Sequence, residues 1–171
     1  MRSSRWTFLS SFSAVLLVAF ALGAPSTAWA DSGADFSGTF TATLPERAEI
    51  LNLHADGTAE ITLSDQVTSG AGGFTFSDSF GSWKKTGPRR LVARFLNLNF
   101  DVSTPAATYS GVAVVDYVFQ FAPNLKTFAA SCQGKIFPPG ADPFNPASVP
   151  VTTFDCAYLD GFHYHRMPPL P

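Results

Sequence analysis

The chain has 171 residues, and its 11 lysines and arginines are outnumbered by 13 aspartates and glutamates, which gives a formal net charge of −2. A nucleic-acid partner would require a basic face, so this balance argues against one. The length suits one domain with one hydrophobic core.

The first 30 residues have the anatomy of a signal peptide. Two arginines precede the apolar stretch FLSSFSAVLLVAFALGA, Pro25 follows it, and Ala28-Trp29-Ala30 forms a small-x-small cleavage pattern. We therefore expect cleavage after Ala30, a secreted or periplasmic location, and a mature domain over residues 31–171 with a net charge of about −4. The alternative is an uncleaved membrane anchor, which the serines in the run and the proline disfavour. After cleavage we expect no membrane span.

Alternation of apolar and polar residues dominates the rest of the chain and predicts β-strands. Residues 36–44 alternate, and residues 49–54 and 58–64 form a predicted hairpin around Asp56-Gly57. Further strands are expected at residues 74–85, 90–100, 109–122, 127–136, 151–158 and 162–166. About eight sequential strands favour an all-β domain, a single antiparallel up-and-down β-barrel, whose closure removes exposed edges. A two-layer β-sandwich is the alternative.

The segment FGSWKKTGPRR, residues 80–90, combines four cations with a turn. Neighbouring cations on a strand point to opposite faces, so we interpret them as solvated charges at a hairpin end rather than as an anion site. Trp83 shares a strand face with Gly81, where the missing side chain lets a large ring lie over a neighbouring strand. We expect Trp83 to plug one end of the barrel, with stacking on a ligand as the alternative.

Three segments in this order resemble a family of small secreted bacterial proteins. They are LHADGTAEITLSDQ with its D-G hairpin, FGSWKKTGPRRLVARFLNLNFD with a G-x-W-x-x-T-G pattern, and the Val-rich strand that follows. The resemblance covers residues 36–122 and implies a lipocalin-like or allene-oxide-cyclase-like barrel. The Pro-rich insertion, the two cysteines and the C-terminal YLDGFHYHR depart from the family's pattern. The family has no agreed catalytic residues, so the resemblance implies none here.

Arg94 and Asp116 interrupt the apolar faces of two neighbouring predicted strands. A register in which paired residue numbers sum to 210 places Arg94 opposite Asp116 and Phe100 opposite Ser110. An unpaired buried charge is costly, so we predict a buried cross-strand pair in which Arg94→Ala costs about 3 to 5 kcal/mol. Ligand anchoring, catalysis and solvent exposure are the alternatives.

Both faces of these two strands are apolar, although only one of them can line a barrel. The other face needs a cover, for which the Pro-rich loop, the C-terminal segment, a second subunit and a membrane are candidates. Cover by the loop and homo-oligomerisation both remain open.

Cys132 and Cys156 are the only cysteines, and an even number in an exported chain predicts a disulfide. They flank the Pro-rich loop, residues 137–150, which cannot enter the interior of a sheet. Closing a loop of roughly 25 residues should stabilise the fold by about 3.5 kcal/mol in the chain-entropy model.

Signatures of catalysis and of metal binding are weak. The chain contains no GxSxG, HExxH or Walker pattern. His163 and His165 lie two residues apart and share a strand face, but a third ligand would have to converge from elsewhere. We predict no cofactor, no metal and no catalytic residues.

The functional prediction is an exported, non-enzymatic barrel that binds a small hydrophobic molecule. Most of the 17 phenylalanines fall in alternating strands, and small residues among them leave room for a cavity. The small residues are Gly38, Ala42, Ala93, Gly111 and Ala113. Tyr117 is expected to orient the ligand and Trp83 to close one end, with Arg94 and Asp116 as further candidates. The alternatives are an isomerase or cyclase that uses the cavity, and a filled barrel that acts through its surface or by oligomerisation.

Overall fold

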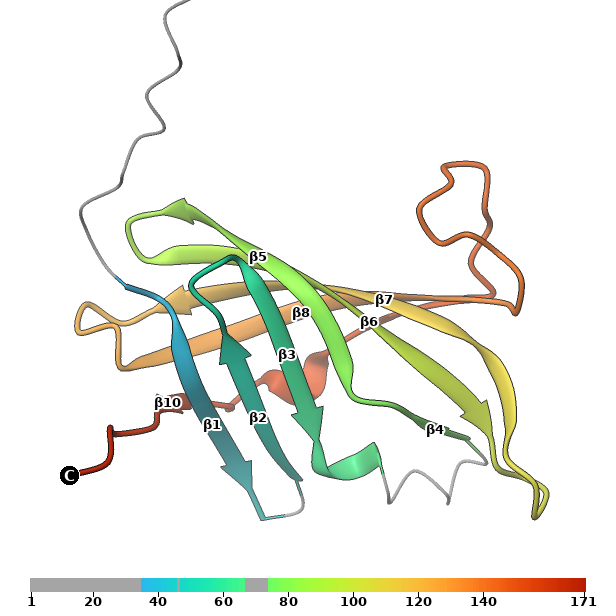
Figure 1. Ribbon diagram of the computed structural model, residues 1–171, viewed down its shortest axis with the longest axis horizontal. Coiled ribbons are helices and arrows are strands. Elements are labelled where there is room, and N and C mark those ends of the chain that lie inside the picture. The colour runs from blue at the N-terminus through green and yellow to red at the C-terminus, as the bar shows by residue number, and fades with distance from the viewer. Residues whose placement is uncertain (1–34, 46, 67–73) are drawn as a thin grey trace, which may run out of the picture. The chain divides into compact units, whose positions relative to one another are not determined.

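The computed structural model describes residues 35–45, 47–66 and 74–171, and these ranges form an all-β domain (Figure 1). The predicted signal peptide lies outside the described residues. The strands are β1 (Gly38–Leu44), β2 (Arg47–Leu53), β3 (Thr58–Leu63), β4 (Phe74–Phe76), β5 (Ser79–Gly87), β6 (Arg90–Asp101), β7 (Thr108–Phe121), β8 (Thr127–Phe137), β9 (Thr152–Asp155) and β10 (Tyr164–Arg166). The short 3-10 helices η1 (Ser64–Gln66) and η3 (Ala157–Leu159) follow β3 and β9.

Eight of the described strands close into an antiparallel barrel. Their order is β10-β1-β2-β3-β5-β6-β7-β8, and β10 also pairs with β8, which completes the ring. β4 adds to β6 and β9 adds to β8, both outside this ring. The ring confirms the predicted barrel in place of the sandwich, because every strand of the ring has a partner on each side.

The longest strand pair, β6 with β7, has the predicted register over most of its length. Arg94 pairs with Asp116 and Leu98 with Val112. The prediction is wrong for Phe100, which pairs with Tyr109 because a bulge follows Asn99. A bulge inserts an unpaired residue and shifts the register beyond it, and the sequence-based register did not include it.

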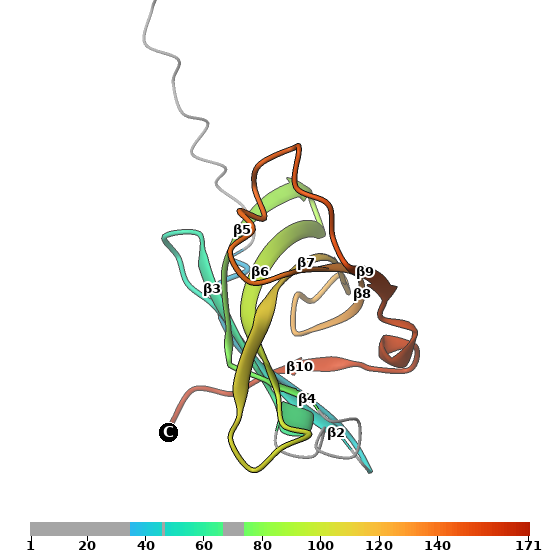
Figure 2. The same cartoon turned by 90° about the vertical axis from the view of Figure 1, so that its right-hand side faces the viewer.

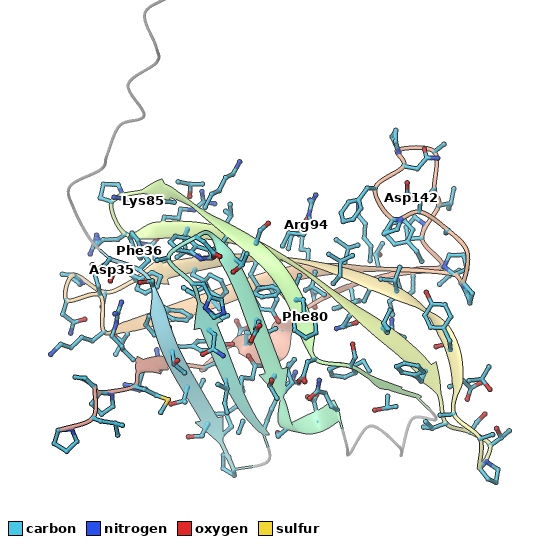
Figure 3. The ribbon with its side chains drawn as sticks, in the orientation of Figure 1. Asp35, Phe36, Phe80, Lys85, Arg94 and Asp142 are labelled. Atoms are coloured by element: carbon cyan, nitrogen blue, oxygen red, sulfur yellow. A yellow bond between two sulfur atoms is a disulfide. The ribbon has the colours of Figure 1, made fainter. Side chains whose placement is uncertain are left out.

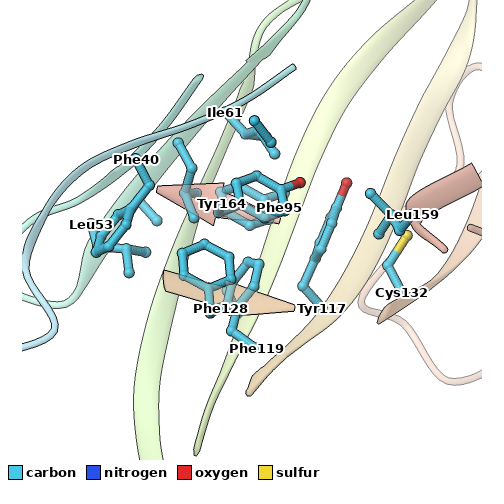
Figure 4. Close-up of a cluster of buried hydrophobic side chains, with 14 of the residues drawn as sticks. Phe40, Leu53, Ile61, Phe95, Tyr117, Phe119, Phe128, Cys132, Leu159 and Tyr164 are labelled. Carbon is cyan, nitrogen blue, oxygen red and sulfur yellow. The ribbon is translucent and has the colours of Figure 1, made fainter. Parts of the chain in front are cut away.

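Aromatic rings fill the barrel at the end where β7 meets β8. Phe128 contacts the rings of four neighbours at centroid distances between 4.4 and 5.1 Å, and all five side chains are at most 2% exposed (Figure 4). The neighbours are Phe40, Phe119, Phe121 and Tyr164. Each fully buried ring contributes roughly 1.5 to 3 kcal/mol through the hydrophobic effect, so this end of the barrel forms the stable core.

The Pro-rich loop covers part of the outer face of β7. Figure 2 shows this connection between β8 and β9 projecting from the sheet before the chain returns as β9. Val112, Val114 and Phe137 form a small buried cluster on that face, and Ala141 of the loop packs against it. The loop therefore supplies one of the covers that the sequence required.

Candidate binding cavity inside the barrel

The interior contains a cavity of about 440 Å³ at the end opposite the aromatic core. This end is formed by η1, β4, the start of β5 and the ends of β6 and β8. Its apolar lining residues are Leu63, Phe76, Phe95, Ala113, Val115, Tyr117, Ile136 and Phe154. The barrel is thus packed with rings at one end and hollow at the other.

The hollow end arises from side-chain size on the inner faces of neighbouring strands. β7 presents the small side chains of Ala113 and Val115 there, whereas towards the core it presents Phe119 and Phe121. Next to Val115, Gly134 of β8 has no side chain, and the ring of Phe154 lies across it at the distance where a Cβ would clash. Small residues thus create the space, and a ring from β9 bounds it.

Two asparagines on the inner face of β6 line this cavity. Asn97 donates from Nδ2 to Ser79 Oγ at 3.2 Å, and Asn99 is 6% exposed. Within the described part of the chain, Asn97 Oδ1 and Asn99 Nδ2 are buried without a hydrogen-bond partner. Such atoms cost free energy unless something else satisfies them, so they are the candidate polar contacts of this cavity.

A charged cluster forms one wall of the cavity. Arg47 and Asp65 line it, and the Arg47 guanidinium lies 3.3 Å from a Glu49 oxygen and 3.0 Å from an Asp65 oxygen. Glu49 is 1% exposed and accepts a hydrogen bond from the Tyr164 hydroxyl. Burial raises the pKa of the Glu49 carboxyl, while the bond from Tyr164 and the charge of Arg47 oppose that rise.

The sequence analysis did not select these polar residues, although the alternation of inward and outward side chains along each strand indicated them. Glu49 shares a strand face with buried Leu51, and Asn97 and Asn99 share a face with buried Phe95. A polar residue on an otherwise apolar face is the same kind of signal that selected Arg94.

Of the four predicted ligand-binding residues, Tyr117 lines the interior cavity. Trp83 instead packs against the core near the opposite end, and its Nε1 donates to the His54 carbonyl at 2.9 Å. Trp83 is thus half-buried against the core and does not line the interior cavity. Gly81 is needed beside it, because a Cβ there would lie 1.9 Å from the Arg94 carbonyl oxygen.

Arg94 and Asp116 form the predicted cross-strand pair, but the prediction that the pair is buried is wrong. The guanidinium donates to both carboxylate oxygens, at 2.6 and 2.8 Å, yet each side chain is 53% exposed. Figure 3 shows Arg94 projecting away from the barrel. The opposite face of both strands lines the interior, so these charges lie on the outside.

This exposure changes the expected effect of mutating Arg94. We expect Arg94→Ala to lower the free energy of unfolding by less than about 1 kcal/mol, because solvent screens an exposed pair even when its geometry is bidentate. Urea unfolding of Arg94→Ala, Asp116→Ala and the double variant at two salt concentrations measures this loss of stability. A loss above about 2 kcal/mol would show that the pair is shielded from water.

A second, outer groove of about 710 Å³ lies between the Pro-rich loop and the outer face of β7 and β8. Its lining includes the paired Arg94 and Asp116, and Phe144 of the loop, which is 57% exposed. Because Arg94 and Asp116 already pair with each other and the groove faces solvent, it is a weaker candidate than the interior cavity.

Cys132 and Cys156 are disulfide-bonded, with their Cα atoms 5.2 Å apart, which confirms the predicted bridge. Among the described residues, no group of three or more His, Cys, Asp and Glu side chains is placed to hold a metal ion. In the same part of the chain, none of the helices has the length and apolarity that a membrane span requires. No protein family, curated protein or solved structure matches this chain.

Proposed function

We propose that this protein binds a small hydrophobic molecule in the interior cavity and performs no chemistry on it. The observation that carries the proposal is the cavity itself, about 440 Å³ with mainly apolar walls. That volume falls within the range of roughly 300 to 1,000 Å³ typical of ligand pockets, which combine apolar walls with a few placed polar groups.

Normal packing of a protein interior supports a ligand in this space. Interiors are close-packed, and apolar side chains that border a void lose contacts with neighbouring atoms. An apolar molecule that contacts Phe95, Ile136 and Phe154 would restore those contacts and leave water. The end that binds the ligand is then separate from the aromatic end that stabilises the fold.

An isomerase or cyclase remains a second candidate because of Glu49, whose pKa is raised by burial. A general acid or base must reach the substrate. The Glu49 side chain has no exposed surface, it is bonded to Tyr164 and Arg47, and it does not line the cavity. These contacts favour a structural role for Glu49 and a binding role for the cavity.

The proposal also includes export of the chain and its relation to a family of secreted proteins. We infer that the chain is exported, with its leader cleaved after Ala30, and that it is related to the small secreted bacterial barrels which its hairpin and G-x-W-x-x-T-G segment resemble. The closed barrel and the disulfide are in keeping with both inferences.

Filling the cavity is expected to weaken ligand binding at least about tenfold, which corresponds to about 1.4 kcal/mol. Ala113→Phe places a ring among the lining residues, whereas Ala129→Phe, on the exposed outer face of β8, is the matched control. Native mass spectrometry of protein from its own host would identify the co-purified molecule, and titration with that molecule would compare the two variants.

The same mass spectra test the inferred cleavage site, because the exported chain should begin at Asp31. Separate unfolding curves should show that both variants fold. Equal affinity in the two variants, or the absence of any co-purified molecule from wild-type protein, would count against binding in the interior and favour a surface function.

A further inference from the structure

We propose that the cavity selects neutral molecules whose polar group both donates and accepts a hydrogen bond, such as primary amides and alcohols, and that Asn97 and Asn99 hold this group. The inference rests on the proposed ligand-binding function and adds the chemical class of the ligand.

The two asparagines offer complementary atoms to one ligand group. They lie two residues apart on β6, so their side chains share the inner face, and both line the cavity. Asn97 uses its Nδ2 on Ser79 and keeps Oδ1 as an acceptor, while Asn99 keeps Nδ2 as a donor. Neither of these two atoms has a partner among the described residues.

Only a group with both functions satisfies both atoms. A carboxylate only accepts and would leave Asn97 Oδ1 unsatisfied, and an ammonium only donates and would leave Asn99 Nδ2 unsatisfied. A site built to hydrogen-bond a ligand group discriminates strongly against an analogue that leaves a buried polar atom unpaired. A primary amide or a hydroxyl can donate to the first atom and accept from the second.

The charges around the cavity also disfavour an anion. Arg47 is the only cationic side chain among the described lining residues, and its guanidinium already faces Glu49 and Asp65. With Glu49 either protonated or ionised, the total charge of these three side chains is zero or negative. A ligand carboxylate would therefore enter a low-dielectric site that has no cation left to neutralise it.

The size of the cavity limits the rest of the molecule. One water molecule occupies about 30 Å³ in the liquid, and we take the same volume for each non-hydrogen atom of a ligand with its hydrogens. On this basis a cavity of 440 Å³ holds roughly 15 non-hydrogen atoms. Beyond the polar group, the ligand meets the rings of Phe76, Phe95 and Phe154 and the side chain of Ile136. The expected ligand is thus a medium-length alkyl or terpenoid body with one neutral head.

Four probes with the same alkyl chain test the preference: decanamide, decanol, decanoate and decylammonium. We expect the mature protein to bind decanamide and decanol at least about tenfold more tightly than the two ions at neutral pH, measured by calorimetry and native mass spectrometry. Decanoate or decylammonium binding as tightly as decanamide would overturn the inference and leave the proposed function intact. If no probe binds and no host molecule co-purifies, both fail.

Asn99→Leu is the decisive variant. It removes the free donor from the cavity while it keeps the side-chain size, so the ammonium no longer leaves a buried donor unsatisfied, and we expect the preference for decanamide over decylammonium to fall at least about fivefold. The melting temperature should rise, because an unsatisfied buried amide is replaced by an apolar group. Asn145→Leu, in the exposed Pro-rich loop, is the control and should leave the preference unchanged. An unchanged preference in Asn99→Leu would overturn the role of the asparagines.

Discussion

Replacing Cys132 and Cys156 together with serine is expected to lower the free energy of unfolding by about 3.5 kcal/mol. The bridge closes a segment whose ends are 24 residues apart in sequence, and it limits the conformations of the unfolded chain. In the folded protein it ties η3 to β8, next to Leu159 and Phe162, which are at most 2% exposed. Urea unfolding of the oxidised wild type and the double variant measures the difference.

Reduction provides the control for this prediction. Dithiothreitol should shift the wild-type midpoint towards that of the double variant and leave the variant itself unchanged. Because Thr152 and Phe154 of β9 line the cavity and lie within the bridged segment, loss of the bridge should also weaken ligand binding. Coincident unfolding curves for the oxidised and reduced wild type would contradict the predicted contribution.

The barrel was predictable because its information lies in short-range patterns. Strict alternation marks strands, and Asp56-Gly57 marks a tight hairpin, both of which the structure confirms in β2 and β3. The register of β6 against β7 was also predictable, because one offset matched Arg94 with Asp116 and aligned the apolar residues around them.

The choice of inner face could not be made from these two strands alone. Both faces of β6 and β7 carry apolar residues, so alternation does not distinguish inside from outside. What decides is ring closure, which turns Phe95 and Tyr117 inward, together with Ala141 of the Pro-rich loop, which packs on the outer face. Neither contact is local in sequence, and for this reason the Arg94 pair was predicted to be buried.

The path of the chain near Cys156 also differs from the prediction. The predicted strand over residues 151–158 ends at Asp155, and the chain continues as η3. The Cys156 amide donates to the Cys132 carbonyl at 3.2 Å, beside the bridge, and the turn of η3 follows. The tertiary contacts of Cys156 with Cys132 thus override the local strand pattern at this point.

The cavity was predicted only in outline. The sequence indicated that large and small side chains share inner faces, but a void requires small residues of different strands to meet at one level. Val115 of β7 and Gly134 of β8 meet in this way only because of the register between those strands. The polar residues of the site were visible in the sequence as polar positions on otherwise apolar strand faces. The sequence did not show that these residues lie around one cavity.

Tyr164→Phe is expected to lower the free energy of unfolding by about 2 to 3 kcal/mol at pH 8, because it removes the hydroxyl that donates to the buried Glu49 carboxylate. The ring that stacks on Phe128 is retained, so the loss reports the hydrogen bond rather than packing. Tyr109→Phe, whose side chain is 42% exposed, is the matched control and should change stability by less than about 0.5 kcal/mol.

The pH dependence of this loss follows from the raised pKa of Glu49. The folded state favours protonated Glu49, so the stability linked to this proton is fully present below about pH 4.5, the ordinary glutamate value, and is lost as the pH rises through the raised pKa. Above it, folded Glu49 is ionised and depends most on the Tyr164 hydroxyl. The cost of Tyr164→Phe should therefore grow with pH across this window. Urea unfolding of the wild type and the variant between pH 4 and pH 8 tests it. A constant cost would show that Glu49 keeps one protonation state throughout, and a cost that falls with pH would contradict the predicted dependence of the ionised carboxylate on Tyr164.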